Sequence, residues 1–301
     1  MGNAFSVNDG SQKELRKLSV DGCPVIGEGA HAVVYKTRPD EIIKVYRPGI
    51  FVEDIDRERK LARWALVKGL PTAIPFDVVS VGDSYGVVFE LLNAISSVEY
   101  IHDSRENFED FIVKSVDLMK EIHSIEVEGG ELPDMKQNTV KWVGEIRSFL
   151  SDDVFSRLCR LVDQIPDSHT LLHADFHVKN IMVSKGELML IDMDTLCIGD
   201  PVFELATVYN SYREFPDIDP EAAAFIGISV DMGREIWEKT LRLYYSDASD
   251  EELRRIEKKA QILGCVRIIN FMNRHREHPA YEAAVSRCLK DINERIPDIN
   301  Q

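Results

Sequence analysis

The spacing of apolar positions divides the chain into a strand-rich beginning and a long helical remainder. Four runs rich in apolar residues predict strands, at residues 32–37, 42–46, 76–81 and 85–92, and the last two alternate with a period of two. The last two strands flank Gly82-Asp83-Ser84, which indicates a hairpin. Between the strand pairs, residues 50–69 have helical spacing, and Gly69 ends the segment. The pattern predicts a small sheet with one helix.

From about residue 95 apolar side chains recur at helical spacing. The predicted helices span residues 108–125, 140–150, 152–165, 202–212, 220–228, 230–245, 250–271 and 280–296. We therefore expect an α+β fold with an N-terminal lobe at residues 15–93, built from an antiparallel sheet and one helix. A mostly helical C-terminal lobe takes residues 94–301. Residues 1–14 are polar and are predicted to be a disordered N-terminus.

One stretch among the helices, residues 171–206, carries candidate chemistry. His173, Asp175 and Asn180 form the pattern H-x-D-x-x-x-x-N, and Asp192 follows Asp175 by seventeen residues. In phosphoryl transfer one carboxylate faces the acceptor hydroxyl, while an amide and a second carboxylate hold the metal on the nucleotide. Such a motif also arises by chance, so a nucleotide-binding half upstream decides the interpretation.

A predicted hairpin supports the metal-site interpretation. Residues 181–183 and 188–191 read as short strands around a polar turn with Gly186. This hairpin is expected to bring Asn180, just before it, close to Asp192, just after it. Both side chains offer the hard oxygen ligands that Mg²⁺ prefers.

The upstream half contains a glycine pair and a lysine in an apolar strand. Gly27 and Gly29 precede the strand at residues 32–37, where missing Cβ atoms would let backbone amides approach phosphates, although a plain hairpin turn explains them too. Lys44 lies within the apolar run at residues 42–46, so it either extends to solvent or has a specific partner.

The lysine has a candidate partner on the predicted helix. Glu58 follows Lys44 by fourteen residues and would hold it toward the nucleotide phosphates; the alternatives are a surface position for Glu58, with Glu53 as the partner. At the end of the next hairpin, backbone groups from Glu90 to Leu92 are candidates to bind an adenine edge.

Composition narrows the class of partner and compartment. The formal net charge of −16 disfavours a nucleic-acid partner and mildly favours a cationic or neutral substrate; the alternative is that the acidity serves solubility alone. Five scattered cysteines without a C-x-x-C motif predict a reducing cytoplasm, with no disulfide framework and no zinc site. No apolar run approaches the roughly 18 residues of a membrane span. The short match to a myristoylation pattern at residues 1–6 is discounted.

Taken together, these motifs resemble the aminoglycoside phosphotransferase family, which has the protein-kinase-like two-lobed fold and includes choline, thiamine, homoserine and methylthioribose kinases. The resemblance covers about residues 20 to 290. The residues that carry it are Gly27, Gly29, Lys44, Glu58, His173, Asp175, Asn180, Asp192 and the segment GDPVFELA at residues 199–206.

The resemblance implies ATP and Mg²⁺ as cofactors and a role for each motif residue. Asp175 would position or deprotonate the acceptor hydroxyl, and Asn180 and Asp192 would ligate Mg²⁺. Lys44 would contact the nucleotide phosphates. His177 stands where related kinases carry a cation near the transferred phosphate.

Other positions are less settled. The resemblance implies that Glu204 or Asp200 braces the catalytic loop from behind. Ala32 replaces a glycine of the family pattern. Asp194 adds a carboxylate to the metal motif, where it would hold metal, hold a substrate amine or form a turn. Lys179 stands where small residues are commoner.

Three functions compete. The first is a kinase that phosphorylates a hydroxyl of a small molecule such as an aminoglycoside, choline or thiamine. The second is a protein kinase, which the short segment after Asp192 and the missing A-P-E motif disfavour. The third is a nucleotide-binding regulator. Residues 200–252 are rich in acids and contain Trp237, Tyr244 and Tyr245, which would suit a cationic acceptor or would only form a solvated face over core aromatics.

Overall fold

The computed structural model describes residues 15–29, 31–128 and 130–299, and the chain divides into two compact units. The first unit runs to Ile95 and also includes Ile181–Asp194, and the second contains Ser96–Asn180 and everything from Thr195 onward. The expectations for residues 1–14, including the acylation motif, lie outside the described residues.

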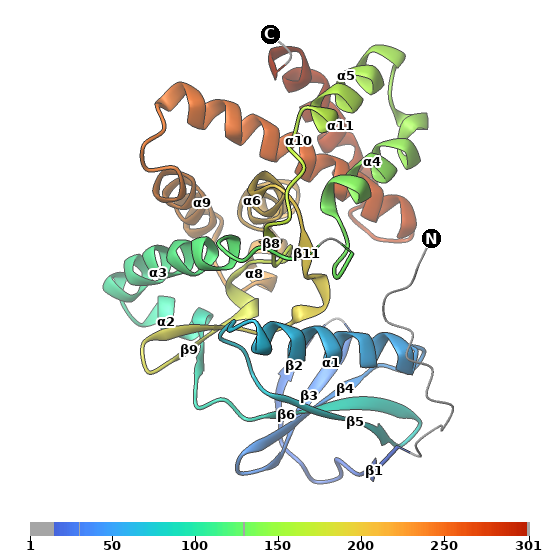
Figure 1. Ribbon diagram of the computed structural model, residues 1–301, viewed down its shortest axis with the longest axis vertical. Coiled ribbons are helices and arrows are strands. Elements are labelled where there is room, and N and C mark those ends of the chain that lie inside the picture. The colour runs from blue at the N-terminus through green and yellow to red at the C-terminus, as the bar shows by residue number, and fades with distance from the viewer. Residues whose placement is uncertain (1–14, 30, 129, 300–301) are drawn as a thin grey trace. The chain divides into compact units, whose positions relative to one another are not determined.

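The first unit contains a six-stranded sheet in the order β1-β5-β6-β4-β3-β2. Its strands are β1 (Lys17–Leu18), β2 (Val25–Glu28), β3 (Ala32–Arg38), β4 (Glu41–Tyr46), β5 (Pro75–Val81) and β6 (Ser84–Glu90). All neighbours pair antiparallel except β1 and β5, which are parallel. Figure 1 shows α1 (Val52–Val67) lying along one face of this sheet. The predicted antiparallel sheet with one helix is thus present.

Successive side chains of β4 point to opposite faces of the sheet. Ile43 is fully buried and belongs to one cluster with Val79 and Val88. Tyr46 points to the other face, where it packs with Ile55 of α1. Lys44 has the parity of Tyr46, so its side chain emerges on the face that α1 covers.

The predicted hairpin forms from β9 (Ile181–Ser184) and β10 (Glu187–Leu190). Its two-residue turn has both central residues in the left-handed region, with φ of 52° at Lys185 and 84° at Gly186. The hairpin joins the first unit through hydrogen bonds, from the Leu190 amide to the Pro71 carbonyl at 2.7 Å and from Ser184 Oγ to the Asn93 carbonyl at 3.0 Å. The chain passes into the second unit at β7 (Ile95–Ser96).

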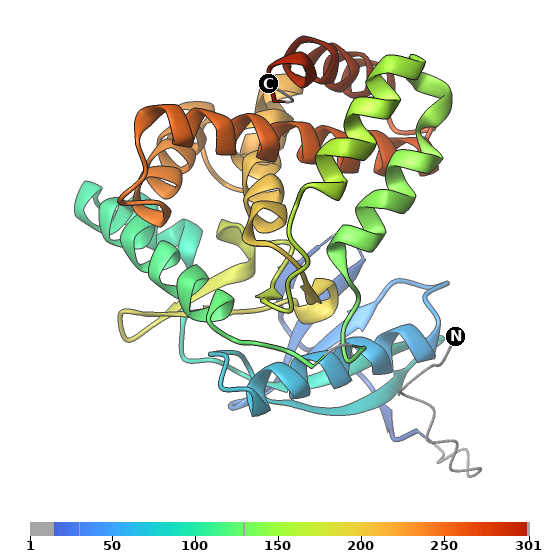
Figure 2. The ribbon, with the colours of Figure 1, turned by 45° about the horizontal axis from the view of Figure 1, so that its top comes forward.

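The second unit is helical. Its larger helices are α3 (Arg105–His123), α4 (Met135–Glu145), α5 (Asp152–Asp163), α6 (Pro201–Tyr209), α9 (Val230–Tyr244), α10 (Asp250–Arg274) and α11 (Tyr281–Ile299), and a short helix, α2 (Ser97–Asp103), precedes them. Further short helices are α7 (Phe215–Ile218) and α8 (Pro220–Phe225). Figure 2 shows α10 crossing α6, and the two helices pack against each other with a buried core that includes Ala206, Val266 and Ile269. The strands β8 (Leu171–Leu172) and β11 (Cys197–Ile198) pair antiparallel as a two-stranded ribbon.

Most predicted helices are present with shifted ends. The helix expected at residues 140–150 begins instead at Met135, because Asp134 caps it through the Gln137 amide. The short α2, capped by Ser96, was not predicted. The helix expected at residues 202–212 is α6, which ends at Tyr209 and continues as the π-helical turn Asn210–Glu214. Within the described residues, no helix combines the length and apolarity needed to cross a membrane.

Candidate active site

In the first unit a cluster of three charged side chains forms around Lys44. Its Nζ donates to Oε1 of Glu58 at 2.7 Å and also to the carboxylate of Asp192. The predicted pair with Glu58 is therefore present. The link to Asp192, 148 residues away in sequence, was not predicted. Partial burial alone would lower the pKa of Lys44, but the charges of Asp192 and Glu58 outweigh it and raise that pKa above its ordinary value. Lys44 is thus a fixed cation.

Asp192 holds its position in a strained backbone conformation. Its φ is 66°, a left-handed value that is uncommon for residues other than glycine, and it lies between β10 and the turn Met193–Thr195. Such strain persists only where the surroundings enforce it, and it clusters at functional sites. The Asp192 side chain is 41% exposed, so an oxygen remains accessible to a metal while Lys44 holds the carboxylate.

Tyr46 completes the lysine cluster, and the sequence interpretation missed it. The Nζ of Lys44 lies 5.4 Å from the centroid of the Tyr46 ring. Burial, followed by the charge of Glu58, raises the pKa of Tyr46 above its ordinary value. The signal was available, because residues two apart on a strand share a face.

The other nucleotide-binding candidates lie at two loops of the first unit. The Gly29 amide donates to the Ala32 carbonyl at 2.9 Å, which closes the turn between β2 and β3. At the end of β6, the Glu90 amide donates to the Ile74 carbonyl at 3.1 Å and the Leu91 amide to the Asp40 carbonyl at 2.8 Å. These two amides are used within the fold. The backbone amide of Leu92 is therefore the donor of this segment that remains a candidate to bind an adenine edge.

In the second unit the motif at residues 173–180 forms a closed loop around Asp175. The Asn180 side-chain nitrogen donates to Oδ2 of Asp175 at 2.8 Å and to its backbone carbonyl at 2.9 Å. The Asn180 amide donates to the His177 carbonyl at 2.9 Å. These bonds orient the Asn180 side chain so that its amide oxygen is the atom left for a metal.

Two imidazole rings and a guanidinium lie around the Asp175 carboxylate. Nε2 of His177 lies 3.5 Å from Oδ2 of Asp175. Partial burial alone would raise the pKa of Asp175, but the interaction with His177 and the charges of His173 and Arg267 hold it well below its usual range. Asp175 therefore stays ionised at neutral pH. Such a carboxylate is a weak base, and it is better suited to orienting a hydroxyl and accepting its proton late than to removing the proton early.

Glu204 braces this loop from behind, which decides between the two candidates for that role. It is fully buried, and it accepts the backbone amides of His173 at 2.6 Å and Ala174 at 2.9 Å. Burial alone would raise the pKa of Glu204, but the nearby His123 and His173 rings and the backbone amide of Ala174 hold that pKa below its ordinary value. Asp200 instead caps α6 through the Val202 amide at 2.9 Å.

The network behind the loop includes residues that the sequence interpretation missed. Nε2 of His123 lies 3.8 Å from Oε2 of Glu204, and its Nδ1 is 2.6 Å from the hydroxyl of Tyr244. The Tyr212 hydroxyl accepts the Val178 amide at 3.0 Å. Nothing in the local sequence pattern marks His123, since its partner is 81 positions away.

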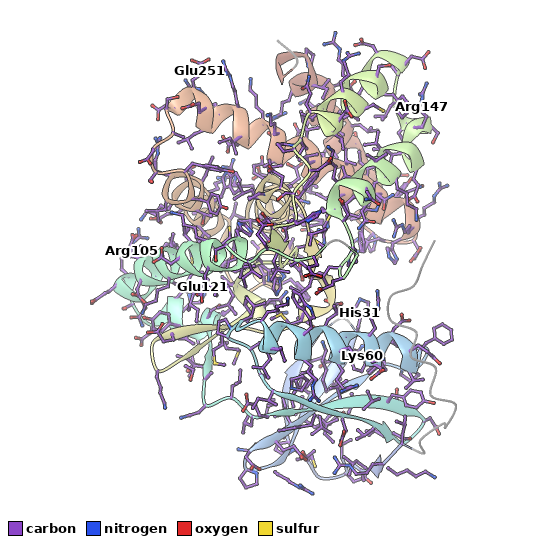
Figure 3. The ribbon with its side chains drawn as sticks, in the orientation of Figure 1. His31, Lys60, Arg105, Glu121, Arg147 and Glu251 are labelled. Atoms are coloured by element: carbon purple, nitrogen blue, oxygen red, sulfur yellow. The ribbon has the colours of Figure 1, made fainter. Side chains whose placement is uncertain are left out.

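The acidic stretch with its aromatic residues fits the plainer of its two interpretations. Trp237 is fully buried and makes an edge contact with Tyr209, at 5.0 Å between ring centroids. Tyr244 is the partner of His123. Glu235 pairs at 2.8 Å with Arg105, which projects from α3 in Figure 3. Trp237 thus belongs to the core, and Glu235 forms an ion pair on a helix surface.

The fold and the two clusters define a class: phosphotransferases with a protein-kinase-like fold, in which a lysine held by carboxylates and an Asp-Asn loop carry the chemistry. The model of the phosphotransferase enzyme family matches residues 22–235, and the chain belongs to this family. A search of curated protein sequences found no match.

Solved structures agree on the fold. The chain is similar to APH(2'')-IIa in ternary complex with streptomycin and ATP (18% identity, TM-score 0.57, covering 89% of this chain and 90% of the other). It is also similar to ADP-bound aminoglycoside phosphotransferase APH(2'')-Ib (19%, TM-score 0.56, 92% of each chain). A choline/ethanolamine kinase family protein from Mesorhizobium loti matches with 12% identity and TM-score 0.58, over 92% of this chain and 90% of the other. The predicted α+β, protein-kinase-like fold is confirmed.

Proposed function

We propose that this protein transfers the γ-phosphoryl group of ATP to a hydroxyl group of a small molecule, with Mg²⁺ as cofactor. The observation that carries the proposal is the cluster in which Lys44 bonds both Glu58 and Asp192. A lysine fixed between two carboxylates, one of them accessible, matches the phosphate-binding and metal-binding needs of this chemistry. Solved relatives in complex with ATP, ADP and GDP support nucleotide use.

The donor set suits Mg²⁺. The amide oxygen of Asn180 and the carboxylate of Asp192 are hard ligands, and neither residue type competes for a soft metal. When bound, the ion neutralises charge on the nucleotide phosphates. Lys44 adds a fixed positive charge for the phosphates. The imidazole ring of His177 lies beside Asp175.

Asp175 acts on the acceptor in this proposal. Its carboxylate, held by Asn180 and charged at neutral pH, accepts a hydrogen bond from the acceptor hydroxyl and directs the oxygen lone pair at the phosphorus. The proton passes to Asp175 as the new P–O bond forms and the bond between the γ-phosphorus and the bridging oxygen breaks, so that ADP leaves. Gly27 and Gly29 leave room for phosphate oxygens at the turn between β2 and β3.

A small acceptor is favoured over a polypeptide by the length of chain after the metal motif. Only residues 193–200 separate Asp192 from the first residue of α6, and part of them forms β11. That segment is too short to contain an activation segment that seats a peptide. A nucleotide-binding regulator is the second candidate, since solved structures with this fold are complexes with ATP, ADP and GDP.

A coupled assay of ADP release tests the proposal. Mg-ATP is offered with a panel of aminoglycosides, choline, thiamine, homoserine and sugars. We expect an acceptor-dependent rate that Asp175→Asn lowers by about 10²–10⁴-fold while nucleotide binding survives. Asp192→Ala should instead weaken Mg-ATP binding.

Three results would count against the assignment. Full turnover by Asp175→Asn would remove its catalytic role. Unchanged Mg-ATP affinity in Asp192→Ala would remove the metal role. Nucleotide binding without phosphorylation of any acceptor, in an expanded panel, would favour the regulator.

A further inference from the structure

A cavity of about 210 Å³ opens beside Asp175, and all of its lining residues belong to the second unit. The π-helical turn after α6 contributes Asn210 and Ser211, and α10 contributes Arg267 and Phe271. Single π-helical turns in longer helices are frequent at functional sites. A larger hollow of about 750 Å³, where α3, α9 and α10 meet, is lined by Trp237 but by none of the candidate catalytic, nucleotide-binding or metal-binding residues. The cavity at Asp175 is thus the place where an acceptor would meet the catalytic carboxylate.

The cavity is small and has little negative charge. Ligand pockets for drug-sized molecules start at about 300 Å³, so this one fits a small metabolite or one end of a larger molecule. Asp175 is the only acid among its described lining residues. A polycation such as an aminoglycoside would find no further carboxylate here to bind its amines.

Arg267 is the unusual member of the lining. Its guanidinium makes no hydrogen bond or ion pair with any described residue, and its Nη1 is buried without a partner. Its guanidinium carbon lies 6.0 Å from the centroid of the Trp142 ring, and its charge also acts on the Asp175 carboxylate without a direct ion pair. A buried donor on a charged group is costly to leave unpaired, so such groups normally have a partner. The missing partner is therefore best supplied from the cavity.

We propose that Arg267 binds an anionic group of the acceptor, so that the substrates are small hydroxylated acids, with a carboxylate or a phosphate group, rather than polycations. The proposal rests on the phosphotransferase function above. Arginine offers forked donors that match either anion, and Lys would not replace that geometry. Phe271, 47% exposed, provides an apolar wall for the carbon chain between the hydroxyl at Asp175 and the anion at Arg267.

The test uses acceptors matched in length and different in charge: 4-hydroxybutyrate, 1,4-butanediol and 4-amino-1-butanol, with glycerol 3-phosphate and glycerol as a phosphate pair. ADP release is measured for each with Mg-ATP. We expect the anionic member of each set to have the higher kcat/KM by about tenfold or more, as for a charged hydrogen bond. Comparing kcat/KM for 4-hydroxybutyrate and glycerol 3-phosphate shows whether the site prefers a carboxylate or a phosphate.

Variants tie the preference to the residue. Arg267→Gln should raise KM for the acid by roughly 10–100-fold, with a smaller change in kcat. Arg267→Lys should recover part of that loss. Arg274→Gln, on the same helix and 56% exposed, is the matched control and should leave KM unchanged. A merely structural role for Arg267 would change kcat and stability without the split between KM and kcat.

Calorimetric titration of the same acids into the enzyme with Mg²⁺ and a non-hydrolysable ATP analogue separates the two proposals. Acid binding that Arg267→Gln removes, without turnover of any acceptor, would overturn the kinase function and leave the anion site standing. Turnover that favours the amine or the neutral alcohol would overturn the anion site and leave the kinase function standing. Absence of acid binding to the wild-type enzyme would also overturn it, even if the variants do not fold.

Discussion

Oε1 of Glu204 accepts a hydrogen bond of 2.9 Å from the backbone amide of Ala174, the residue that immediately precedes Asp175. Ala174 has φ of 62°, in the left-handed region that costs a residue with a Cβ atom roughly 1–2 kcal/mol. The buried Glu204 carboxylate thus holds a strained backbone in place and helps to fix the orientation of the next residue, Asp175.

Glu204→Gln tests this brace. The glutamine has the same size, but its amide nitrogen cannot accept the backbone amides that both carboxylate oxygens now accept. We expect the free energy of unfolding to fall by about 1.5–3 kcal/mol, the range for hydrogen bonds to a charged group, and kcat to fall with it. Urea unfolding and steady-state kinetics measure the two effects. Asp200→Asn is the matched control, because asparagine caps α6 as well as aspartate does. Retention of wild-type stability and kcat in Glu204→Gln would show that the strained loop holds itself.

Lys44 links two acids that lie far apart in sequence. Replacing Lys44 should therefore weaken nucleotide binding more than replacing Glu58 does. In Lys44→Ala no cation faces the phosphates, and we expect the Kd for Mg-ATP to rise roughly 10–100-fold. In Glu58→Gln the bond to Asp192 still holds Lys44, so the rise should be smaller. Calorimetry measures both.

The control for this pair is Lys60→Ala. Lys60 lies on the same helix as Glu58, is labelled in Figure 3, and pairs at 2.8 Å with Asp56 on the exposed side. It should leave the Kd unchanged. Equal effects of Lys44→Ala and Lys60→Ala would mean that only net charge matters.

The sequence predicted the contacts that follow from one strand, one helix and one motif. Lys44 and Glu58 could be paired because parity on β4 places the lysine on the face that the next helix covers. The link from Lys44 to Asp192 and the cavity at Arg267 depend on how distant segments pack, which no periodicity encodes. Arg267 is the only charged residue in the largely apolar stretch 260–273 of α10, a signal that the sequence interpretation did not use.

Helix ends show the same limit on a smaller scale. Apolar spacing located α4 only from residue 140, whereas the cap at Asp134 sets its first residue five positions earlier. The π-helical turn at Asn210 follows from tertiary packing: the Asn210 side chain donates to the Gly264 carbonyl on α10 at 3.1 Å. Local propensity does not contain that contact.

Glu214 predicts a pH dependence of stability that is separate from catalysis. Burial, followed by the charge of Asp291, raises the pKa of Glu214 to about 7, against about 4.5 in the unfolded chain. A raised pKa means that its contribution to stability is fully present below about pH 4.5 and is lost as the pH rises through about 7. Glu214→Gln keeps the neutral shape at every pH. We expect it to be more stable than the wild type at pH 8, by about 1–3 kcal/mol, and nearly equal at pH 4.5.

Chemical unfolding of both proteins between pH 4.5 and pH 8 measures this difference. Glu238→Gln, at a side chain that is 70% exposed, is the control and should show no such trend. A difference that is constant across the pH range would mean that Glu214 is charged in the folded protein, with Arg287, 3.7 Å away, as its counter-ion.

The glycine pair at the turn after β2 separates a demand of the fold from a demand of the ligand. A Cβ atom at Gly29 would have the Ala32 carbonyl oxygen as its nearest neighbour at 3.9 Å, and the backbone there does not adopt a left-handed φ. The fold itself thus accepts alanine, and Gly29→Ala should change the free energy of unfolding by no more than about 0.5 kcal/mol. If backbone amides of this turn contact phosphates, the same methyl group should still raise the Kd for Mg-ATP.

Gly86→Ala serves as the opposite case, because its Cβ would lie 2.8 Å from a side-chain atom of Ile43 and should cost about 1–3 kcal/mol of stability. Measuring unfolding and nucleotide Kd for both variants therefore decides whether Gly29 serves the ligand: an unchanged Kd in Gly29→Ala would reduce the motif to an ordinary hairpin turn.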